Sequence, residues 1–228
     1  MSRKHPVVTT IKTLACVAAF APLAALAAGT ATLQNDDDIV KIQWQDTNTA
    51  RFSSEDTDDY MVVQDDKVFM VTSEGGKPQV LDIGDMAQMF MAFLDDETIE
   101  SMAPSELDKA EATGDTETIA GIKGEVYNIS YTTEDDNTEE AEVVLTDDNT
   151  VAELTDVGIN LLKTLTNRPH IGDFIESLPD GKRGILRMED NYTLVSISDE
   201  TPDDSVFELP AEPQGLQEIM QGLKDMMQ

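Results

Sequence analysis

Short runs of alternating apolar and polar residues, separated by polar turns, constrain the fold of this chain more than any other sequence feature. Val40, Ile42 and Trp44 alternate with polar residues, which is the period of a strand with one buried face. Similar runs at 60–63 and 68–71 follow after loops too short for the crossovers that parallel strands require. The sequence therefore predicts an antiparallel meander of four or five strands from about residue 39 to residue 81.

The period changes after this meander. Apolar residues at helical spacing predict a helix over 85–94, a short second helix over 104–110 and a longer mid-chain helix that ends before Arg168 and Pro169. The apolar side of the longer helix is formed by Leu154, Val157, Leu161, Leu162 and Leu165. An acidic loop is predicted at 111–115. Further strands are predicted at 116–119, 123–132 and 139–145, and a hairpin at 184–197.

The first 28 residues have the pattern of a secretory signal peptide. Basic residues precede an apolar run of about 15 residues, and the run ends in an Ala-x-Ala cleavage motif near Ala28. A membrane span would need roughly 20 apolar residues. Cys16 is the only cysteine, and it lies inside the run rather than behind it. We therefore predict a periplasmic product that has neither a cysteine nor a transmembrane span.

Charge is the next constraint, because 46 acidic residues against 15 basic ones give a net charge of −31. Binding to nucleic acid requires a basic face, so this class of partner is excluded, and an anionic lipid surface is disfavoured. Doublets such as Asp147–Asp148 are interpreted as solvated hairpin turns on a surface suited to a saline habitat. Calcium binding is the alternative, but no segment forms a complete Asp-x-Asp-x-Asp-Gly loop, so no metal site is predicted.

Side chains with catalytic chemistry are few. After the predicted leader, His170 is the only histidine, and the sequence contains no triad signature, phosphate-binding loop or zinc motif. Met86, Met89 and Met91 offer soft ligands for Cu(I), although helical spacing favours packing for the first two. Carboxylate pairs are too numerous to single out for glycoside hydrolysis. We therefore predict a protein that is not an enzyme and has no cofactor.

Two segments carry a resemblance. The sequence GDTETIAGIKGEVYNI at 114–129, followed by DDSVFELP at 203–210, resembles an uncharacterised family of exported bacterial domains similar to the LolA/LolB lipoprotein-carrier fold. The resemblance implies an incomplete, strongly curved antiparallel β-barrel with helices over its open mouth. Related chains often carry a cysteine where this chain has Gly124, so a redox role there is not implied. The segments are also explained as a tight turn at Gly121 and an edge strand that ends at Pro210.

Together these patterns divide the chain into a signal peptide (1–28), a flexible acidic segment (29–38), a LolA/LolB-like β-rich domain (39–212) and a C-terminal amphipathic helix (213–228). The predicted fold class is α+β, with a curved antiparallel sheet whose concave side is covered by helices. We expect a non-catalytic periplasmic domain that binds an apolar group such as a lipid, an acyl chain or an envelope component. The alternative is an envelope assembly factor that binds a partner protein through the C-terminal helix.

Candidate ligand-binding residues are those that strand alternation and the helical stripe turn toward the concave side. They are Trp44, Phe69, Leu81, Met86, Phe90, Tyr127, Ile129 and Met188. The competing interpretation is that the same side chains pack against one another as an ordinary core.

Overall fold

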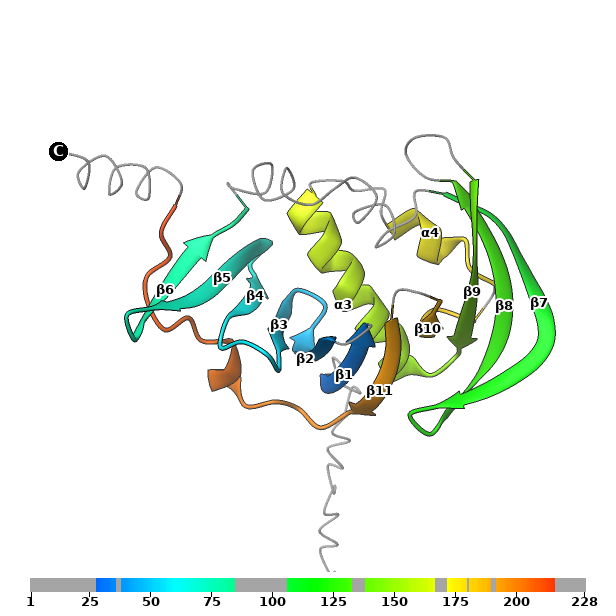
Figure 1. Cartoon of the computed structure of the whole chain (residues 1–228), viewed down its shortest axis with the longest axis horizontal. Helices are drawn as coiled ribbons and strands as arrows, with labels where there is room; N and C mark the ends of the chain where they lie inside the picture. The colour runs from blue at the N-terminus through cyan, green and yellow to red at the C-terminus, as the bar shows by residue number, and fades with distance from the viewer. Residues whose placement is uncertain are drawn as a thin grey trace, which may run out of the picture.

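The structure is a computed structural model, and it describes residues 28–35, 38–84, 106–132, 138–166, 172–179, 181–189 and 192–215. In these residues, eleven strands form one open antiparallel sheet in the order β6-β5-β4-β3-β2-β1-β11-β10-β9-β8-β7 (Figure 1). The strands are β1 (Gly29–Asn35), β2 (Asp38–Asp46), β3 (Thr49–Ser54), β4 (Tyr60–Gln64), β5 (Lys67–Glu74), β6 (Lys77–Asp82), β7 (Glu106–Ile119), β8 (Ile122–Thr132), β9 (Thr138–Thr146), β10 (Gly184–Met188) and β11 (Tyr192–Ser198). The helices are α3 (Asn149–Thr166), α4 (Asp173–Glu176) and the 3-10 helix η2 (Asp204–Phe207). The predicted large antiparallel sheet is confirmed.

Strands β2 to β6 form the meander that the alternation predicts. Each strand pairs with the next in antiparallel register, and in the β5–β6 pair Met70 lies opposite Leu81. Asp65 and Asp66 connect β4 to β5 with φ angles of 53° and 58°. Positive φ at both central residues is what a two-residue hairpin turn of type I′ requires.

Strand β1 lies in the middle of the sheet, between β2 and β11. This position corrects the prediction of a flexible segment at 29–38. In β1, Ala31 and Leu33 pack into the core and alternate with polar residues, so the segment has the same strand period as the meander. Ala31 lies opposite Ile42 of β2 and Ile197 of β11. Strand β1 therefore forms a seam that joins the first described strands to the last one.

Strand β7 replaces two elements predicted from local sequence, a short helix at 104–110 and an acidic loop at 111–115. The first two residues of that predicted helix lie outside the described part of the chain. The rest pairs with β8, and the register shifts between Ala112 and Thr116, where Gly114 has a φ of +89°. Cross-strand pairing outweighs weak local helix preference, and the bulge accommodates the extra residues of the acidic stretch.

Helix α3 confirms the predicted mid-chain helix. Its buried residues are Val151, Leu154, Thr155, Val157, Leu161 and Leu165, and Leu162 is half-buried. The Asp148 carboxylate accepts hydrogen bonds from the backbone N–H groups of Thr150 (3.0 Å) and Val151 (3.1 Å). Asp148 is therefore the N-cap of α3. This corrects the interpretation of the doublet at 147–148 as a hairpin turn.

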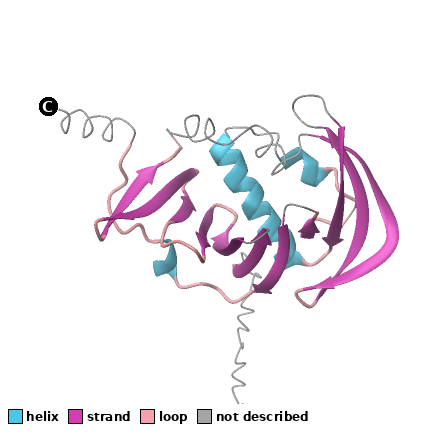
Figure 2. Ribbon diagram, viewed as in Figure 1, coloured by secondary structure: helices cyan, strands magenta, loops and turns pink. Residues whose placement is uncertain are grey.

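Helices α3 and α4 lie against the sheet (Figure 2), and two apolar cores hold them there. The central core joins α3 to β1–β6 and contains Ala31, Ile42, Trp44, Ala50, Phe52, Val63, Val68 and Ile83, with further residues of β8 to β11. The tyrosine core joins α4 to β8–β10 and contains Tyr127, Ile129, Tyr131, Val143, Leu145, Phe174, Ile175, Leu178, Ile185 and Met188. Figure 1 shows β7 and β8 strongly bent, with α4 on the inner side of the bend.

The hairpin predicted at 184–197 is confirmed, because β10 and β11 pair with Met188 opposite Tyr192. After β11 the chain forms a strap, residues 203–215, that crosses β2–β6. The backbone N–H of Gln214 donates to Val80 (2.8 Å), and that of Asp82 donates to Gln214 (3.0 Å), so the strap ends against the outer edge of β6.

The strap corrects the interpretation of 207–210 as an edge strand, because Phe207 ends a 3-10 helix and residues 208–210 form no strand. The Asp203 carboxylate accepts the backbone N–H of Ser205 (2.9 Å) and starts a 3-10 turn there. The predicted helix at 85–94 lies outside the described residues, as do residues 216–228 of the C-terminal helix predicted at 213–228. Residues 213–215 are described and are not helical, because Gln214 forms a β-bridge with Leu81 of β6. In the part that the structure describes, no helix has the length and apolar character needed to cross a membrane.

Candidate functional site

The residues predicted to line one concavity lie in three separately packed groups. Trp44 and Leu81 pack in or against the central core, and Tyr127, Ile129 and Met188 belong to the tyrosine core. Phe69 packs with Val71, Val80, Tyr60 and Leu209 in a third group, the outer patch. Met86 and Phe90 lie outside the described residues. The structure therefore does not bring the six described residues together in one shared cavity.

Trp44 is completely enclosed, with an exposed fraction of 0%. It lies opposite Gly29 of β1, where an added Cβ would be 2.4 Å from the indole ring, so β1 needs a glycine at this position. On α3, burial raises the pKa of Glu153, a hydrogen bond with Trp44 lowers it to a smaller extent, and the charge of Asp156 raises it. A carboxyl group with a raised pKa thus lies beside the indole.

Leu81 belongs to an apolar row that crosses the sheet. Met61 lies opposite Phe52 on one side and opposite Met70 on the other, and Met70 lies opposite Leu81. Phe52 is buried, whereas Met61, Met70 and Leu81 are only partly buried and pack against the central core. We call these three residues the methionine row. Unbranched thioether side chains adapt to irregular apolar partners, so the row is a candidate contact surface for such a group.

In the tyrosine core, two hydroxyl groups reach carboxylates. Tyr127 donates to Glu125 (3.1 Å) and Tyr131 donates to Glu139 (3.0 Å). Burial, followed by the Glu139 hydrogen bond, raises the pKa of Tyr131 to about 12. Lys182 lies 3.0 Å from Glu125 and, together with Tyr127, lowers the pKa of that carboxyl group. At neutral pH these tyrosines are uncharged donors rather than nucleophiles.

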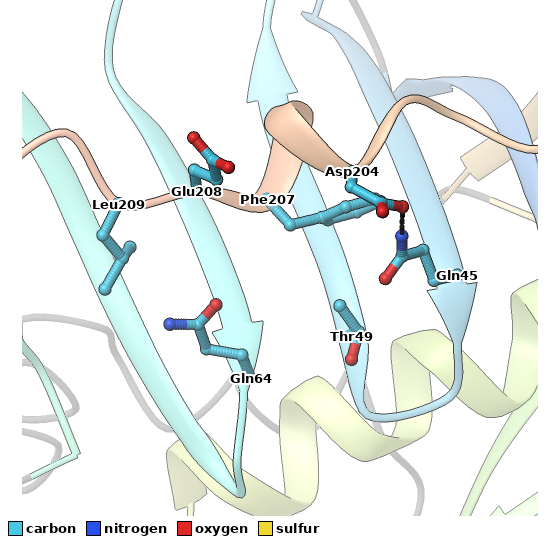
Figure 3. A pocket seen from close by; sticks show the side chains of 7 residues that line it. All are labelled: Gln45, Thr49, Gln64, Asp204, Phe207, Glu208 and Leu209. Carbon is cyan, nitrogen blue, oxygen red and sulfur yellow. Dashed lines mark hydrogen bonds between the residues drawn. The ribbon is translucent and has the colours of Figure 1, made fainter.

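The strap creates a shallow groove of about 460 Å³ over β2, β3 and β4 (Figure 3). The amide of Gln45 donates to the Asp204 carboxylate at one end, and the Phe207 side chain is buried under the strap. Gln64 and Glu208 lie on opposite sides of the groove. The lining is polar except for the strap's own apolar residues, so the groove does not match the predicted apolar site.

Arg51 anchors the strap, which the sequence reasoning did not identify. Its guanidinium donates to the Val206 carbonyl (3.3 Å) and lies 3.7 Å from the centre of the Tyr60 ring. This cation–π contact adds to the backbone hydrogen bond in fixing the strap. No local signal pairs Arg51 with Val206, because the two are far apart in the sequence.

Two further clefts are polar. One of about 500 Å³ lies on β7–β9 and includes Ile129 together with Glu111, Glu140, Glu142 and Glu189. The other, of about 270 Å³, lies beside α3 and includes Lys163 and Arg183. Among the side chains that the structure describes, no three His, Cys, Asp or Glu residues form a group suited to a metal ion.

Comparisons of the chain with protein-family models, curated proteins and solved structures found no match.

Proposed function

We propose that this protein is a non-catalytic periplasmic domain that binds an apolar group, such as a lipid, an acyl chain or the apolar part of an envelope component. The methionine row carries the proposal. Its side chains lie on the α3-facing side of β4–β6, and they are less buried than Phe52 in the same cross-strand row. The signal-peptide pattern at 1–28 supports the proposed periplasmic location of the protein.

The energetics favour an apolar occupant. Apolar surface left in water costs about 25 cal/mol for each Å², so contiguous, partly exposed apolar side chains are a common mark of a binding surface. The residues of the row are neighbours across three strands, which provides a continuous contact strip rather than isolated side chains. Since two of the three are methionines, the strip suits flexible chains of variable shape.

We also propose that the domain shares the general plan of the LolA/LolB carriers. Support comes from the open antiparallel sheet, the bend in β7 and β8, and the helix packed across the inner side. The central core fills the space directly under α3 with buried side chains. In this proposal the ligand therefore binds beside α3, over the methionine row, rather than beneath the helix.

Energy transfer from the single tryptophan, Trp44, to a dansylated fatty acid tests the proposal on the purified protein. We expect saturable transfer in the native protein. Replacing two methionines of the row in the variant M61Q/M70Q should weaken binding about tenfold, because about 1.4 kcal/mol of apolar contact is lost. The control is Val195→Gln. Val195 is 49% exposed and follows Leu194 of the central core, so it points to the opposite face.

Two results would overturn the proposal. The first is the absence of saturable transfer together with a native mass equal to that of the bare chain after isolation from its own periplasm. The second is equal binding by M61Q/M70Q and Val195→Gln, which would place the probe away from the row. A folded far-ultraviolet circular dichroism spectrum for each variant excludes unfolding as the cause.

A further inference from the structure

A polar cleft of about 270 Å³ lies beside α3, on the side of the helix turned away from the central core. Its lining comes from the β2–β3 turn, from α3 and from the segment before β10. The residues are Thr47, Asp156, Ile159, Asn160, Lys163 and Arg183. None of them was singled out by the sequence, because they come from three separate segments.

Two cations and one carboxylate line this cleft. Arg183 contacts both oxygens of Asp156 through one terminal nitrogen, at 2.9 Å and 3.1 Å. A guanidinium has five N–H donors in total, so this contact leaves donors for a second acceptor. Lys163 forms no ion pair with any residue that the structure describes. Its Nζ lies over Gly172, where an added Cβ would collide with it.

The walls of the cleft are held in place by hydrogen bonds. The Asn160 amide donates to the Thr47 carbonyl (2.9 Å) and ties α3 to the β2–β3 turn. The Thr164 hydroxyl donates to the Asn160 carbonyl (2.8 Å) on the same helix. Ile159 forms an apolar part of the lining and packs against the tyrosine core. Lys163 therefore projects from a helix that is tied to the sheet, and Arg183 lies directly before β10.

We infer that this cleft binds an oxyanion, either a carboxylate or a phosphate group. A local excess of positive charge is unusual in a chain with a net charge of −31. In the lining itself two cations face one carboxylate, Asp156, and that carboxylate is already paired with Arg183. Charge-assisted donors from Arg and Lys are the groups that recognise carboxylate and phosphate.

The ligand is either a free anion or the headgroup of an amphiphile. This inference stands without the proposed apolar function, because it rests on the cleft's own charges. Where the bound molecule also carries an acyl chain, Ile159 offers it an apolar contact in the lining of the cleft.

Nuclear magnetic resonance titration with inorganic phosphate and with acetate, at constant ionic strength, tests the site on the full chain. We expect saturable shifts of the Thr47 and Asn160 amide signals. The variant Lys163→Gln should weaken binding about tenfold, the loss expected for one charge-assisted contact. Asp156→Asn should instead strengthen it several-fold, because it removes the competing carboxylate and releases Arg183.

Matched controls separate local contacts from net charge. The control for Lys163→Gln is Lys77→Gln, which removes the same positive charge. The control for Asp156→Asn is Asp58→Asn, which removes the same negative charge. Lys77 and Asp58 are both exposed, and neither lines the cleft. Equal effects of each variant and its control would overturn the inference, as would the absence of saturable shifts with both anions.

Decyl phosphate distinguishes the two sources. If it binds more tightly than inorganic phosphate and loses that gain in Ile159→Gln, whose side chain is the apolar part of the lining, the headgroup source is supported. Equal affinity for the two supports a free anion. Loss of dansyl-acid binding with phosphate shifts retained would count against the proposed function alone.

Discussion

The two halves of the sheet use different chemistry to hold their strands together. In the meander half, β1–β6, the contacts that join sheet and helix are mainly apolar, and Trp44 is enclosed between β1 and α3. In the wrapped half, β7–β10, carboxylates take part in the packing itself. Tyr131 donates to Glu139, and Arg187 reaches Glu117 (3.0 Å) and Glu142 (2.6 Å).

This difference shows how a very acidic chain can use part of its charge. Carboxylates in the meander half lie mainly at turns, as Asp65 and Asp66 do, where water solvates them. The wrapped half gives several carboxylates a specific donor. We therefore expect the meander half to respond mainly to lost volume and the wrapped half to lost charge partners and to pH.

The largest effect is expected for Trp44→Ala in the meander half. Deleting a fully buried indole leaves a cavity and should lower the free energy of unfolding by about 3–5 kcal/mol. Urea unfolding followed by circular dichroism measures this change. Val195→Ala, at an exposed position, should change stability by less than about 0.5 kcal/mol. A comparable loss in both variants would remove the packing argument for this half.

Gly124→Ala tests how tightly the side chains of the wrapped half pack around β8. An added Cβ would lie 2.5 Å from Val144 and 2.8 Å from Leu186, and overpacking of this kind costs about 1–3 kcal/mol. The matched control is Gly158→Ala in α3, where an added Cβ meets nothing within 4 Å. The control should raise stability by about 0.5–1 kcal/mol, because alanine is the better helix former. If both changes stabilise the protein, the tight packing at Gly124 is not present in solution.

Arg187→Gln tests the charge partners of the wrapped half. The Arg187 side chain is 21% exposed, so its two pairs lie between the surface and buried cases, and we expect a loss of about 1–2 kcal/mol. Lys109→Gln removes the same charge from an exposed pair with Glu111, and should cost less than about 0.5 kcal/mol. Chemical unfolding at pH 7 compares the two. Equal losses would mean that the wrapped half gains nothing specific from its ion pairs.

Tyr131 provides the smallest and most local test. Its pKa is raised to about 12 from an ordinary value of 10.0, so the neutral form is favoured in the folded protein. The stability that Tyr131 contributes is therefore complete below pH 10 and is lost as the pH rises toward 12. Ultraviolet absorbance should show late tyrosinate formation that loses the amplitude of one tyrosine in Tyr131→Phe, because burial also raises the pKa of Tyr127 and of Tyr192. A tyrosinate spectrum unchanged by that substitution would refute the assignment.

Local periodicity was sufficient to predict the elements whose pairing or packing partners are close in sequence. The meander, α3 and the β10–β11 hairpin follow from alternation and helical spacing. Strand β7 did not follow, because its pairing with β8 decides the conformation of a stretch that locally favours helix and loop. Strand β1 has the alternation of a strand, but its place at the centre of the sheet depends on β11, which lies at the far end of the chain.

The candidate site was harder to predict, for a related reason. Val68, Phe69, Met70 and Val71 are all apolar, so alternation cannot tell which of them face α3. In the structure Val68 and Met70 pack in or against the central core, whereas Phe69 belongs to the outer patch. The cleft of Lys163 and Arg183 gave no local signal, because only tertiary folding brings its segments together.

The seam at β1 also makes completion of the sheet a long-range event. Ala31 pairs with Ile42, which is near in sequence, and with Ile197, which belongs to the last described strand. Until the second contact forms, one edge of β1 has no neighbour, and the two halves of the sheet stay unjoined. Because contacts between residues far apart in sequence form slowly, we expect the joining of the halves to limit the rate of folding.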